Sequence, residues 1–577
     1  MNHTVLCRGI VLMACFGLSS CVDVDSSSQL EIILERIENR KSYDEGQYPL
    51  GYFAEDRFAS DAEFAQTQID ALQKLNLDKL SESDRISVEL QLFVLQEQID
   101  YFEFKAYLNP LLSDSGFHND LAYEVRTLDT KQQVEDYINK LEALPVFVDQ
   151  HLELLEKGIA QGITQPRVIF EGYESTYNDH ITENASDNFY FRPFLNLPAI
   201  YSVSQKDSIV KLGESLINET VVPQFKRIKS FFENDYFPAV RQSIGISEIP
   251  NGSAYYQNRV AYYTTLDLTP AEVHQMGLKE VERIHQEMVD IINQIGFKGD
   301  FPSFLEYLRT DPQFYASSGQ ELLMIARDIC KRIDAELPKL FKELPRMPYG
   351  VAPVPDAIAP KYTGGRYIPT SVGSTRPGFY WVNTFNLPSR PLYVLPSLSA
   401  HEAVPGHHLQ MSWNSELGDQ IPQFRRDLYL SAYGEGWGLY SEYLGNEMGI
   451  YTTPYESFGK LTYEMWRACR LVVDTGIHAF GWTRDEAVTF LKDNTALSVH
   501  EVNTEIDRYI SWPGQALSYK VGELTIRRLR EQAEMELGEQ FDIREFHHTI
   551  LKEGTVTLTI LEQLVESYIS NTKAKNG

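Results

Sequence analysis

The chain has 577 residues, of which 81 are acidic and 52 are basic, so its net charge at pH 7 is −29. A chain of this length can bury a large hydrophobic core, and its composition is that of a soluble globular protein. The acidic excess repels polyanions, so we expect no nucleic-acid partner.

The N-terminus has the pattern of an export signal. Arg8 precedes an apolar run over residues 9–18, and Leu18-Ser19-Ser20-Cys21 follows. The segment resembles a bacterial lipobox, which implies a lipoprotein signal peptide in residues 1–21, with cleavage before Cys21 and lipidation of that thiol. Residues 22–29 would then be a flexible tether between the lipid and the folded body. The alternative is an ordinary secretory signal that is cleaved elsewhere.

The compartment follows from the same segment. Val22 stands where an aspartate would mark inner-membrane retention in enterobacteria, so we expect an outer-membrane lipoprotein of the cell envelope that faces the periplasm. Only Cys330 and Cys469 remain in the mature body, which excludes a cysteine-rich metal site and leaves their oxidation state open. No later run of about 20 apolar residues predicts a membrane span.

Residues 30–238 are predicted to be helical. Apolar residues recur at spacings of three and four over residues 60–77, 83–104 and 131–160, as in amphipathic helices. The region carries no chemical motif, so we expect it to form one wall of a cleft. Its aromatic segment 189–194 is expected to serve packing.

Residues 239–577 are expected to form the catalytic region. The stretch Thr269-Pro270-Ala271-Glu272 has the pattern of a helix N-terminus and opens a long helix toward Gly296. A second long helix is predicted over residues 318–342. These helices precede the segment that carries the candidate metal ligands.

Between residues 349 and 395, prolines and glycines alternate with short extended pieces over residues 378–383 and 392–395. We expect a small sheet beside the metal motif, with an edge strand that pairs with the backbone of a peptide substrate. The fold class predicted is therefore mainly α, a large helical body with a small β-sheet. After the motif the chain is predicted to be helical, with breaks near residues 418–422, 452–454, 481, 512–514 and 538.

The stretch from His401 to His408, His-Glu-Ala-Val-Pro-Gly-His-His, has the residue types of a zinc hydrolase site. It is not an HExxH motif, because Pro405 replaces the second histidine. On an unbroken helix, His407 would lie roughly 9 Å along the axis from His401 and about 120° around it, and His408 roughly 10 Å along. Neither could then share an ion with His401, since zinc–nitrogen distances are about 2.0 Å. A zinc site requires a helix break at Pro405-Gly406, and either histidine could be the second ligand.

The motif resembles the active-site helix of the thimet oligopeptidase and carboxypeptidase Taq families, H-E-x-G-H-A-L, with two residues inserted before the glycine. The resemblance aligns His407 with the second ligand and makes His408 the alternative. In those families a later helix supplies a glutamate ligand, with another glutamate seven positions on, and Glu435 and Glu442 repeat this spacing. The resemblance implies one zinc ion bound by His401, His407 and Glu435, with Glu442 supporting a histidine ring.

Glu402 is the predicted general base, because it follows a ligand histidine and can take a proton from water whose pKa the metal lowers. An oxyanion donor is also needed, for which Tyr519 is the first candidate and Tyr509 the second, with packing as the alternative role. Arg376 is a candidate anchor for a peptide carboxylate. Further candidates for substrate contact or support of the site, with structural pairing as the alternative, are His408, Arg508, Asp474 and His478.

Four phrases in order, at residues 401–410, 435–442, 473–478 and 513–520, resemble the bacterial domain-of-unknown-function 885 family. The resemblance covers nearly the whole mature chain and implies a zincin-like helical body with a deep cleft that cuts short peptides. We therefore expect a zinc metallopeptidase. Two alternatives stay open: a lipid-anchored protein that binds peptides or other ligands without turnover, and a metal hydrolase of non-peptide amides or esters.

Overall fold

The structure is a computed structural model that describes residues 25–356, 359, 362–370 and 374–576. The predicted signal peptide and Cys21 lie outside the described residues. Helix α1 (Ser26–Glu38) begins inside the predicted tether, because the Asp25 carboxylate accepts a hydrogen bond from the Ser28 amide at 2.9 Å and caps the helix. The prediction of a tether over residues 22–29 is therefore corrected: residues 26–29 are helical.

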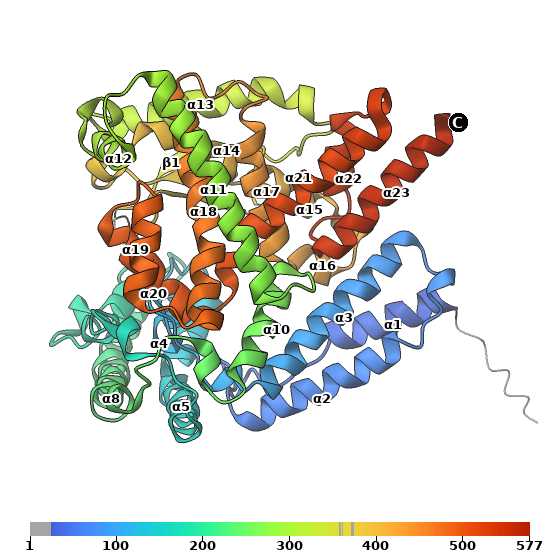
Figure 1. Ribbon diagram of the computed structural model, residues 1–577. Coiled ribbons are helices and arrows are strands. Elements are labelled where there is room, and N and C mark those ends of the chain that lie inside the picture. The colour runs from blue at the N-terminus through green and yellow to red at the C-terminus, as the bar shows by residue number, and fades with distance from the viewer. Residues whose placement is uncertain (1–24, 357–358, 360–361, 371–373, 577) are drawn as a thin grey trace, which may run out of the picture.

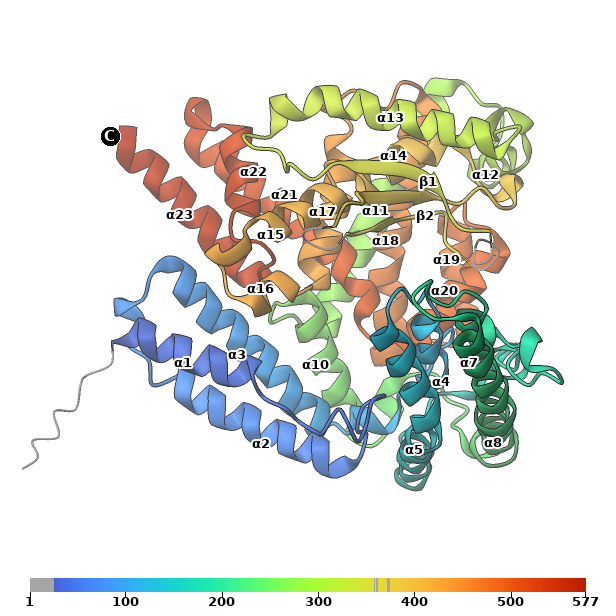
Figure 2. The same ribbon diagram turned by 180° about the vertical axis from the view of Figure 1, so that it is seen from behind.

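Three helices form the N-terminal unit. Helices α1, α2 (Glu55–Leu72) and α3 (Glu82–Glu103) pack together, as the blue ribbons of Figures 1 and 2 show. Their apolar stripes meet in a small hydrophobic core that includes Leu30, Ile69 and Leu95. The apolar spacing predicts both long helices correctly, although α2 lies a few residues earlier than expected.

A second unit is rich in aromatic residues. It is built on α5 (Lys131–Gln161), α7 (Val203–Leu216) and α8 (Val222–Phe231), with a capping box at the start of α5. The aromatic segment Phe189–Leu195 forms a 3-10 helix whose rings are largely buried in the core, so its expected packing role is confirmed. The predicted helix over residues 131–160 is confirmed at both ends.

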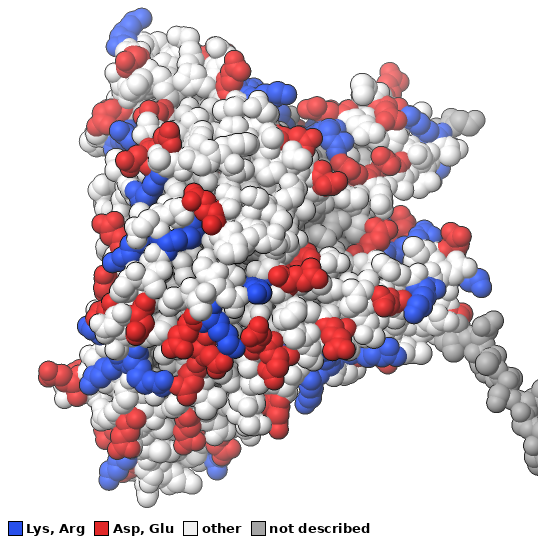
Figure 3. Space-filling view, turned by 60° about the horizontal axis from the view of Figure 1, so that its bottom comes forward, with Lys and Arg blue, Asp and Glu red and all other residues white. Residues whose placement is uncertain are grey.

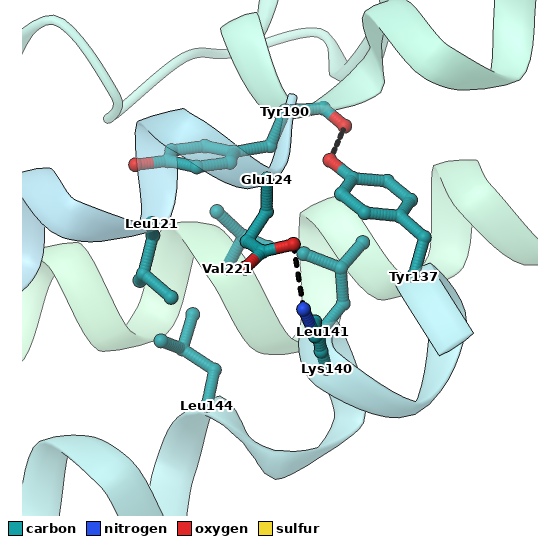
Figure 4. A pocket seen from close by; sticks show the side chains of 8 residues that line it. All are labelled: Leu121, Glu124, Tyr137, Lys140, Leu141, Leu144, Tyr190 and Val221. Atoms are coloured by element: carbon teal, nitrogen blue, oxygen red, sulfur yellow. Dashed lines mark hydrogen bonds and ion pairs between the residues drawn. The ribbon is translucent and has the colours of Figure 1, made fainter. Parts of the chain in front are cut away.

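Figure 4 shows a small cavity in this unit, beside α5. Its volume is about 10 Å³, which is the space of a single water molecule. The Lys140 ammonium pairs with the Glu124 carboxylate at 2.6 Å, and the Tyr137 hydroxyl donates to the Tyr190 carbonyl at 2.6 Å. Because these polar groups satisfy one another, the cavity is a packing gap.

Two pairs of long helices form the C-terminal part. Helix α11 (Pro270–Ile295) packs along α18 (Pro454–Phe480), and α17 (Ser431–Leu444) packs along α21 (Ser518–Leu537). The first pair lies in the middle of the molecule in Figure 1. The predicted breaks in this half are confirmed, since α18 begins and ends, and α21 ends, at the expected proline and glycine positions.

The capping pattern before α11 is confirmed in detail. The Glu272 amide donates to the Thr269 hydroxyl at 3.2 Å, and the Thr269 amide donates to the Glu272 carboxylate at 2.8 Å. At the other end Gly296 takes a left-handed conformation with φ 75°. The predicted helix over residues 318–342 is also confirmed, as α13 (Gly319–Leu340).

The predicted small sheet is confirmed and has three strands, β1 (Tyr349–Pro353), β2 (Gly365–Ile368) and β3 (Gly378–Val382). Its order is β1-β3-β2, with β1 parallel and β2 antiparallel to β3, so β2 is an edge strand. Residues 392–395 are not extended, contrary to prediction. They form a 3-10 turn and the start of the next helix, because Pro396 favours a helix N-terminus.

The two halves of the chain share one core. The largest hydrophobic cluster joins side chains between Leu111 and Val240 to side chains of α11 and α18. Cys330 and Cys469 are buried free thiols. No helix among the described residues is long and apolar enough to cross a membrane. On the face shown in Figure 3, acidic and basic side chains are interspersed.

Candidate metal centre

The predicted helix break is present. Helix α14 (Leu395–Glu402) ends directly after His401 and Glu402, and α15 (His407–Glu416) begins after residues 403–406. The two histidines therefore lie on separate helices joined by a short loop, and the distance limit of an unbroken helix does not apply. The break at Pro405-Gly406 that a shared ion requires is confirmed.

Close backbone contacts hold this loop in place. The Gly406 amide donates to the Ala400 carbonyl at 3.0 Å, and Trp437 Nε1 donates to the Pro405 carbonyl at 2.8 Å. A Cβ atom on Gly406 would lie 1.9 Å from the His401 carbonyl oxygen, so no other residue fits here. The loop thus folds back onto α14 and presents the start of α15 to His401.

His401, His407 and Glu435 converge. Their ligand atoms all lie within 4.8 Å of one another, the Glu435 Oε2 atom being 3.4 Å from His401 Nε2 and 3.5 Å from His407 Nε2. Two ligands about 2.1 Å from a tetrahedral zinc ion are about 3.4 Å apart. The two nitrogen–oxygen distances are therefore compatible with a tetrahedral zinc ion, so the residues fit the ion that the motif implies.

A second carboxylate orients His401. The Glu442 Oε1 atom lies 2.8 Å from His401 Nδ1, and Glu442 Oε2 accepts a hydrogen bond from the Ser397 hydroxyl at 2.8 Å. On the other side the imidazole packs on Gly438, where a Cβ atom would lie 2.6 Å from the ring. Glu442 thus occupies the supporting position that the resemblance implies, and it leaves Nε2 of His401 directed at Glu435.

The charges in this cluster stabilise each other. Burial opposes a charged His401, but the Glu435 and Glu442 carboxylates raise the pKa of His401 to about 10. Burial also opposes the charged form of Glu435 and would raise its pKa, but His407 and His401 hold that pKa well below its usual range. A largely buried carboxylate that stays ionised between two imidazoles is suited to binding a cation.

Glu402 is placed beside the cluster by the sheet. Its Oε2 atom accepts a hydrogen bond from the Tyr367 backbone amide at 2.8 Å, which comes from the free side of edge strand β2. The second carboxylate oxygen has no hydrogen-bond partner among the described residues. The amide therefore fixes the side chain while leaving one oxygen able to accept a proton.

His408 points away from the cluster. Its Nδ1 atom lies 3.0 Å from the Tyr367 hydroxyl, and its Nε2 atom lies 3.1 Å from the Met347 carbonyl. Burial lowers the pKa of His408 to about 4, so the ring is neutral near pH 7. Of the two histidines left open by the sequence, the structure brings only His407 next to His401 and Glu435.

Comparison with known proteins identifies the family. The sequence profile described as bacterial protein of unknown function (DUF885) matches residues 42–565. The chain belongs to this family. No curated protein matches it. The family assignment covers both helical halves and the metal motif, but its description assigns no activity.

Two solved structures share the fold of this family member. A predicted lipoprotein from Colwellia psychrerythraea is 26% identical, covers 95% of this chain and 100% of its own, and superposes with a TM-score of 0.86. A predicted lipoprotein of unknown function from Shewanella oneidensis is 17% identical, covers 93% of this chain and 96% of its own, and has a TM-score of 0.67. The second likeness concerns the fold alone.

Three predicted site residues take part in packing between α18 and its neighbours. Asp474 accepts hydrogen bonds from the Tyr256 hydroxyl at 2.6 Å and the Gly514 amide at 3.1 Å. His478 contacts two backbone groups, at 2.9 and 3.0 Å. The Tyr509 hydroxyl accepts from Trp466 and Arg470 and is buried. Their observed partners match the structural alternative rather than contact with the metal cluster.

Tyr519, Arg508 and Arg376 differ in their surroundings. The half-buried ring of Tyr519 lies 4.4 Å from the Arg470 guanidinium, and Tyr519 is an electrostatic neighbour of Tyr429. Arg508 lies 3.4 Å from Gln515 Oε1 and 3.9 Å from Glu505. Arg376 is exposed, and no described acidic residue pairs with its side chain.

Sequence reasoning missed Tyr429. Its hydroxyl donates to Glu435 Oε1 at 3.0 Å, so it holds the oxygen of the candidate ligand that does not face the histidines. Tyr429 precedes α17 and is 44% exposed. The signal available in the sequence was only its position six residues before Glu435, which is neither a motif spacing nor a helical one.

Proposed function

We propose that this protein is a zinc-dependent peptidase that hydrolyses short peptides, with His401, His407 and Glu435 as metal ligands. The observation that carries the proposal is the pair of 3.4 and 3.5 Å separations, which match a tetrahedral ion. Glu442 orients one ligand, and Glu402 stands next to it in the sequence with one oxygen free. These are the parts of a metal-assisted hydrolase.

When bound, zinc supplies Lewis-acid chemistry, polarising a carbonyl group and lowering the pKa of water. Glu402 accepts a proton from the attacking water, whose oxygen bonds to the carbonyl carbon. The same residue then gives the proton to the leaving nitrogen as the carbon–nitrogen bond breaks. Tyr519 is the proposed donor to the oxyanion, because it lies near Tyr429 and its hydroxyl has no described partner.

Edge strand β2 is the proposed binding rail for an extended peptide. Its Tyr367 amide donates to Glu402, so the outer edge of the strand runs directly past the proposed base, and the other outward-facing backbone groups of the strand are the proposed partners of the peptide. Backbone pairing at an edge strand gives affinity without requiring one particular sequence. A zincin-like body with a cleft is part of this proposal. We also propose that a lipid on Cys21 holds the enzyme at the outer membrane, facing the periplasm.

Metal analysis of three variants tests the proposal. Protein purified without chelators should hold one zinc ion per chain, and His407→Gln should lose it. His408→Gln is the matched control, because the neighbouring imidazole points away from the cluster, and it should keep the metal. Glu402→Gln should keep the metal and lose peptide hydrolysis by roughly a hundredfold or more.

The alternatives give different results. Metal-free protein in which Glu402→Gln leaves ligand binding unchanged would contradict the enzyme and favour a binding protein without turnover. A zinc protein that cuts esters or non-peptide amides, but no member of a peptide library with free and blocked termini, would retain the hydrolase and overturn the peptide substrate.

A further inference from the structure

A cavity of about 250 Å³ lies between the end of β3, the segment before α14, α18 and α20 (Val499–Ser511). We call it the Arg390 cavity. It is smaller than the roughly 300–1,000 Å³ of sites for drug-sized ligands, so it suits a single amino-acid residue. Its lining combines a few polar groups with a mainly apolar wall that includes Tyr393, Leu395, Leu398, Tyr463, Trp466 and Leu497.

Arg390 is an unpaired cation in this cavity. Its Nε atom is buried without a hydrogen-bond partner, and its Nη2 atom makes only a long contact of 3.5 Å with the Tyr362 carbonyl. No described carboxylate forms an ion pair with it. Partial burial of this cation costs free energy and lowers the pKa of Arg390, and the Glu501 carboxylate in the same lining offsets only part of that cost. An anionic group brought by a ligand would remove that cost.

The other charged residues of the lining are already engaged. Arg309 Nη2 donates to the carbonyls of Thr495 and Leu497, at 2.9 and 3.2 Å. Glu501 accepts from the Ser498 amide and hydroxyl and caps α20. Two arginines and one glutamate leave the cavity positively charged in a chain whose net charge is −29. This favours an anionic ligand group at Arg390.

The cavity adjoins the candidate metal centre. Leu398 lies on α14 four residues before Glu402, which is about one helical turn, or roughly 6 Å. Gly364 of the lining directly precedes β2, whose Tyr367 amide binds Glu402. On the opposite wall, Trp466 precedes Arg467, whose guanidinium lies 3.9 Å from Glu442. One extended residue rises about 3.3 Å, and the hydrogen bond from its carboxylate to a guanidinium adds about 2.9 Å, so together they span roughly 6 Å.

We infer that the Arg390 cavity binds the C-terminal residue of the substrate, with its free carboxylate on Arg390 and a large apolar side chain against Trp466 and Leu398. The inference rests on the proposed peptidase function and specifies that cleavage occurs at the C-terminal end of the peptide. Water adds to the preceding carbonyl, the peptide bond breaks, and one amino acid leaves with the proton on its new amino group. The exposed Arg376 is then not the carboxylate anchor.

Binding is tested without turnover, in Glu402→Gln protein. Calorimetric titration with N-acetylphenylalanine and with its C-terminal amide compares an anion with its neutral analogue. The acid should bind about tenfold or more tightly than the amide. Arg390→Gln should abolish this preference, Arg390→Lys should retain part of it, and Arg376→Gln, at an exposed arginine, should leave it intact. Equal binding of acid and amide to the parent protein would overturn the inference without any Arg390 variant.

Turnover separates this inference from the proposed function. Wild-type enzyme should release phenylalanine from peptides that end in a free carboxylate and should cut their amidated forms at least tenfold more slowly. If peptides are cut regardless of the C-terminal group, the carboxylate assignment fails while the peptidase stands. If no peptide is cut but the acid binds tenfold more tightly, the peptidase fails and the anion site remains.

Discussion

The imidazole of His401 is held between two groups, and each constrains it differently. Glu442 accepts its Nδ1 hydrogen at 2.8 Å and sets the direction of the ring, while Gly438 allows the ring to lie directly on α17. A metal ligand must be placed to within a few tenths of an ångström, so its position depends on residues that never touch the ion.

Gly438→Ala should therefore displace His401. The added Cβ atom would lie 2.6 Å from the ring, and the ring would have to move away from His407 and Glu435. Alanine stabilises a helix relative to glycine by about 1 kcal/mol. This gain offsets the cost of displacing the ring, so the free energy of unfolding should change little. We expect zinc affinity to fall by at least tenfold, measured by competition with a chromophoric chelator. A variant that keeps full affinity would show that the contact does not position the ring.

At the scale of residues, the sequence predicts the site residues that are related by a local helical spacing. Glu435 and Glu442 lie two helical turns apart, so the spacing alone predicts a common face. Tyr429, the Tyr367 amide and Arg390 reach the site through the loop before α17, the sheet edge and the segment before α14. No local periodicity links these positions to the motif, so their roles emerge only from the tertiary structure.

At the scale of elements, the helix break is predicted by the spacing of the histidines in the motif. The conformation of residues 392–395 is not predicted by any spacing. The distance limit for a shared ion forces a break between His401 and His407, and the loop over residues 403–406 supplies it. The apolar run over residues 392–395 is too short to separate strand from helix by periodicity. Pro396 decides in favour of the helix.

Three long helices are joined by a buried ion cluster, which gives a further prediction. The fully buried Lys520 of α21 pairs with Glu280 of α11 at 3.0 Å, Glu464 of α18 at 2.9 Å and Glu523 at 2.7 Å. Lys520→Met would leave these carboxylates short of a counter-ion. We expect a loss of about 3–5 kcal/mol in the free energy of unfolding, measured by urea denaturation.

Arg528 on the same helix provides the matched control. It pairs with Glu562, but its side chain is 55% exposed. Arg528→Met should cost no more than about 1 kcal/mol, because water screens an exposed pair. Equal losses in the two variants would mean that the Lys520 cluster adds no more than a surface pair.

At the scale of the whole molecule, the sequence predicts the helical class and the small sheet, but not how the halves are joined. The sequence assigns residues 30–238 to a cleft wall and residues 239–577 to the catalytic region, and the largest core contains Phe232 of the first and Val472 of the second. Side chains separated by hundreds of positions leave no periodic signal in the sequence. The shared core implies that both halves unfold together.

Buried histidines spread through both halves of the protein should make the whole protein acid-labile. Burial lowers the pKa of five of them far below the value of about 6.5 in an unfolded chain. Each binds a proton on unfolding once the pH falls below about 6.5, so stability present at pH 7 is lost as the pH decreases toward 4. The five pKa values are about 3 for His118, His478 and His547 and about 4 for His151 and His408.

One buried acid acts in the opposite direction. Burial raises the pKa of Asp474 to about 7 despite its hydrogen bonds from Tyr256 and the Gly514 amide. Its contribution to stability falls as the pH rises from about 4 to 7, which offsets about one histidine. The remaining histidines should each remove about 2 kcal/mol between pH 6.5 and 5, since one pKa unit corresponds to about 1.4 kcal/mol.

Urea denaturation of chelator-treated protein at pH 7.5, 6 and 5 measures this loss without a contribution from bound metal. His118→Gln should reduce the proton uptake on unfolding at pH 5 by about one, because His118 is fully buried in the aromatic unit beside Thr176. A free energy of unfolding that is constant from pH 7.5 to 5 would show that the buried imidazoles become charged without unfolding, through local opening of the shared core.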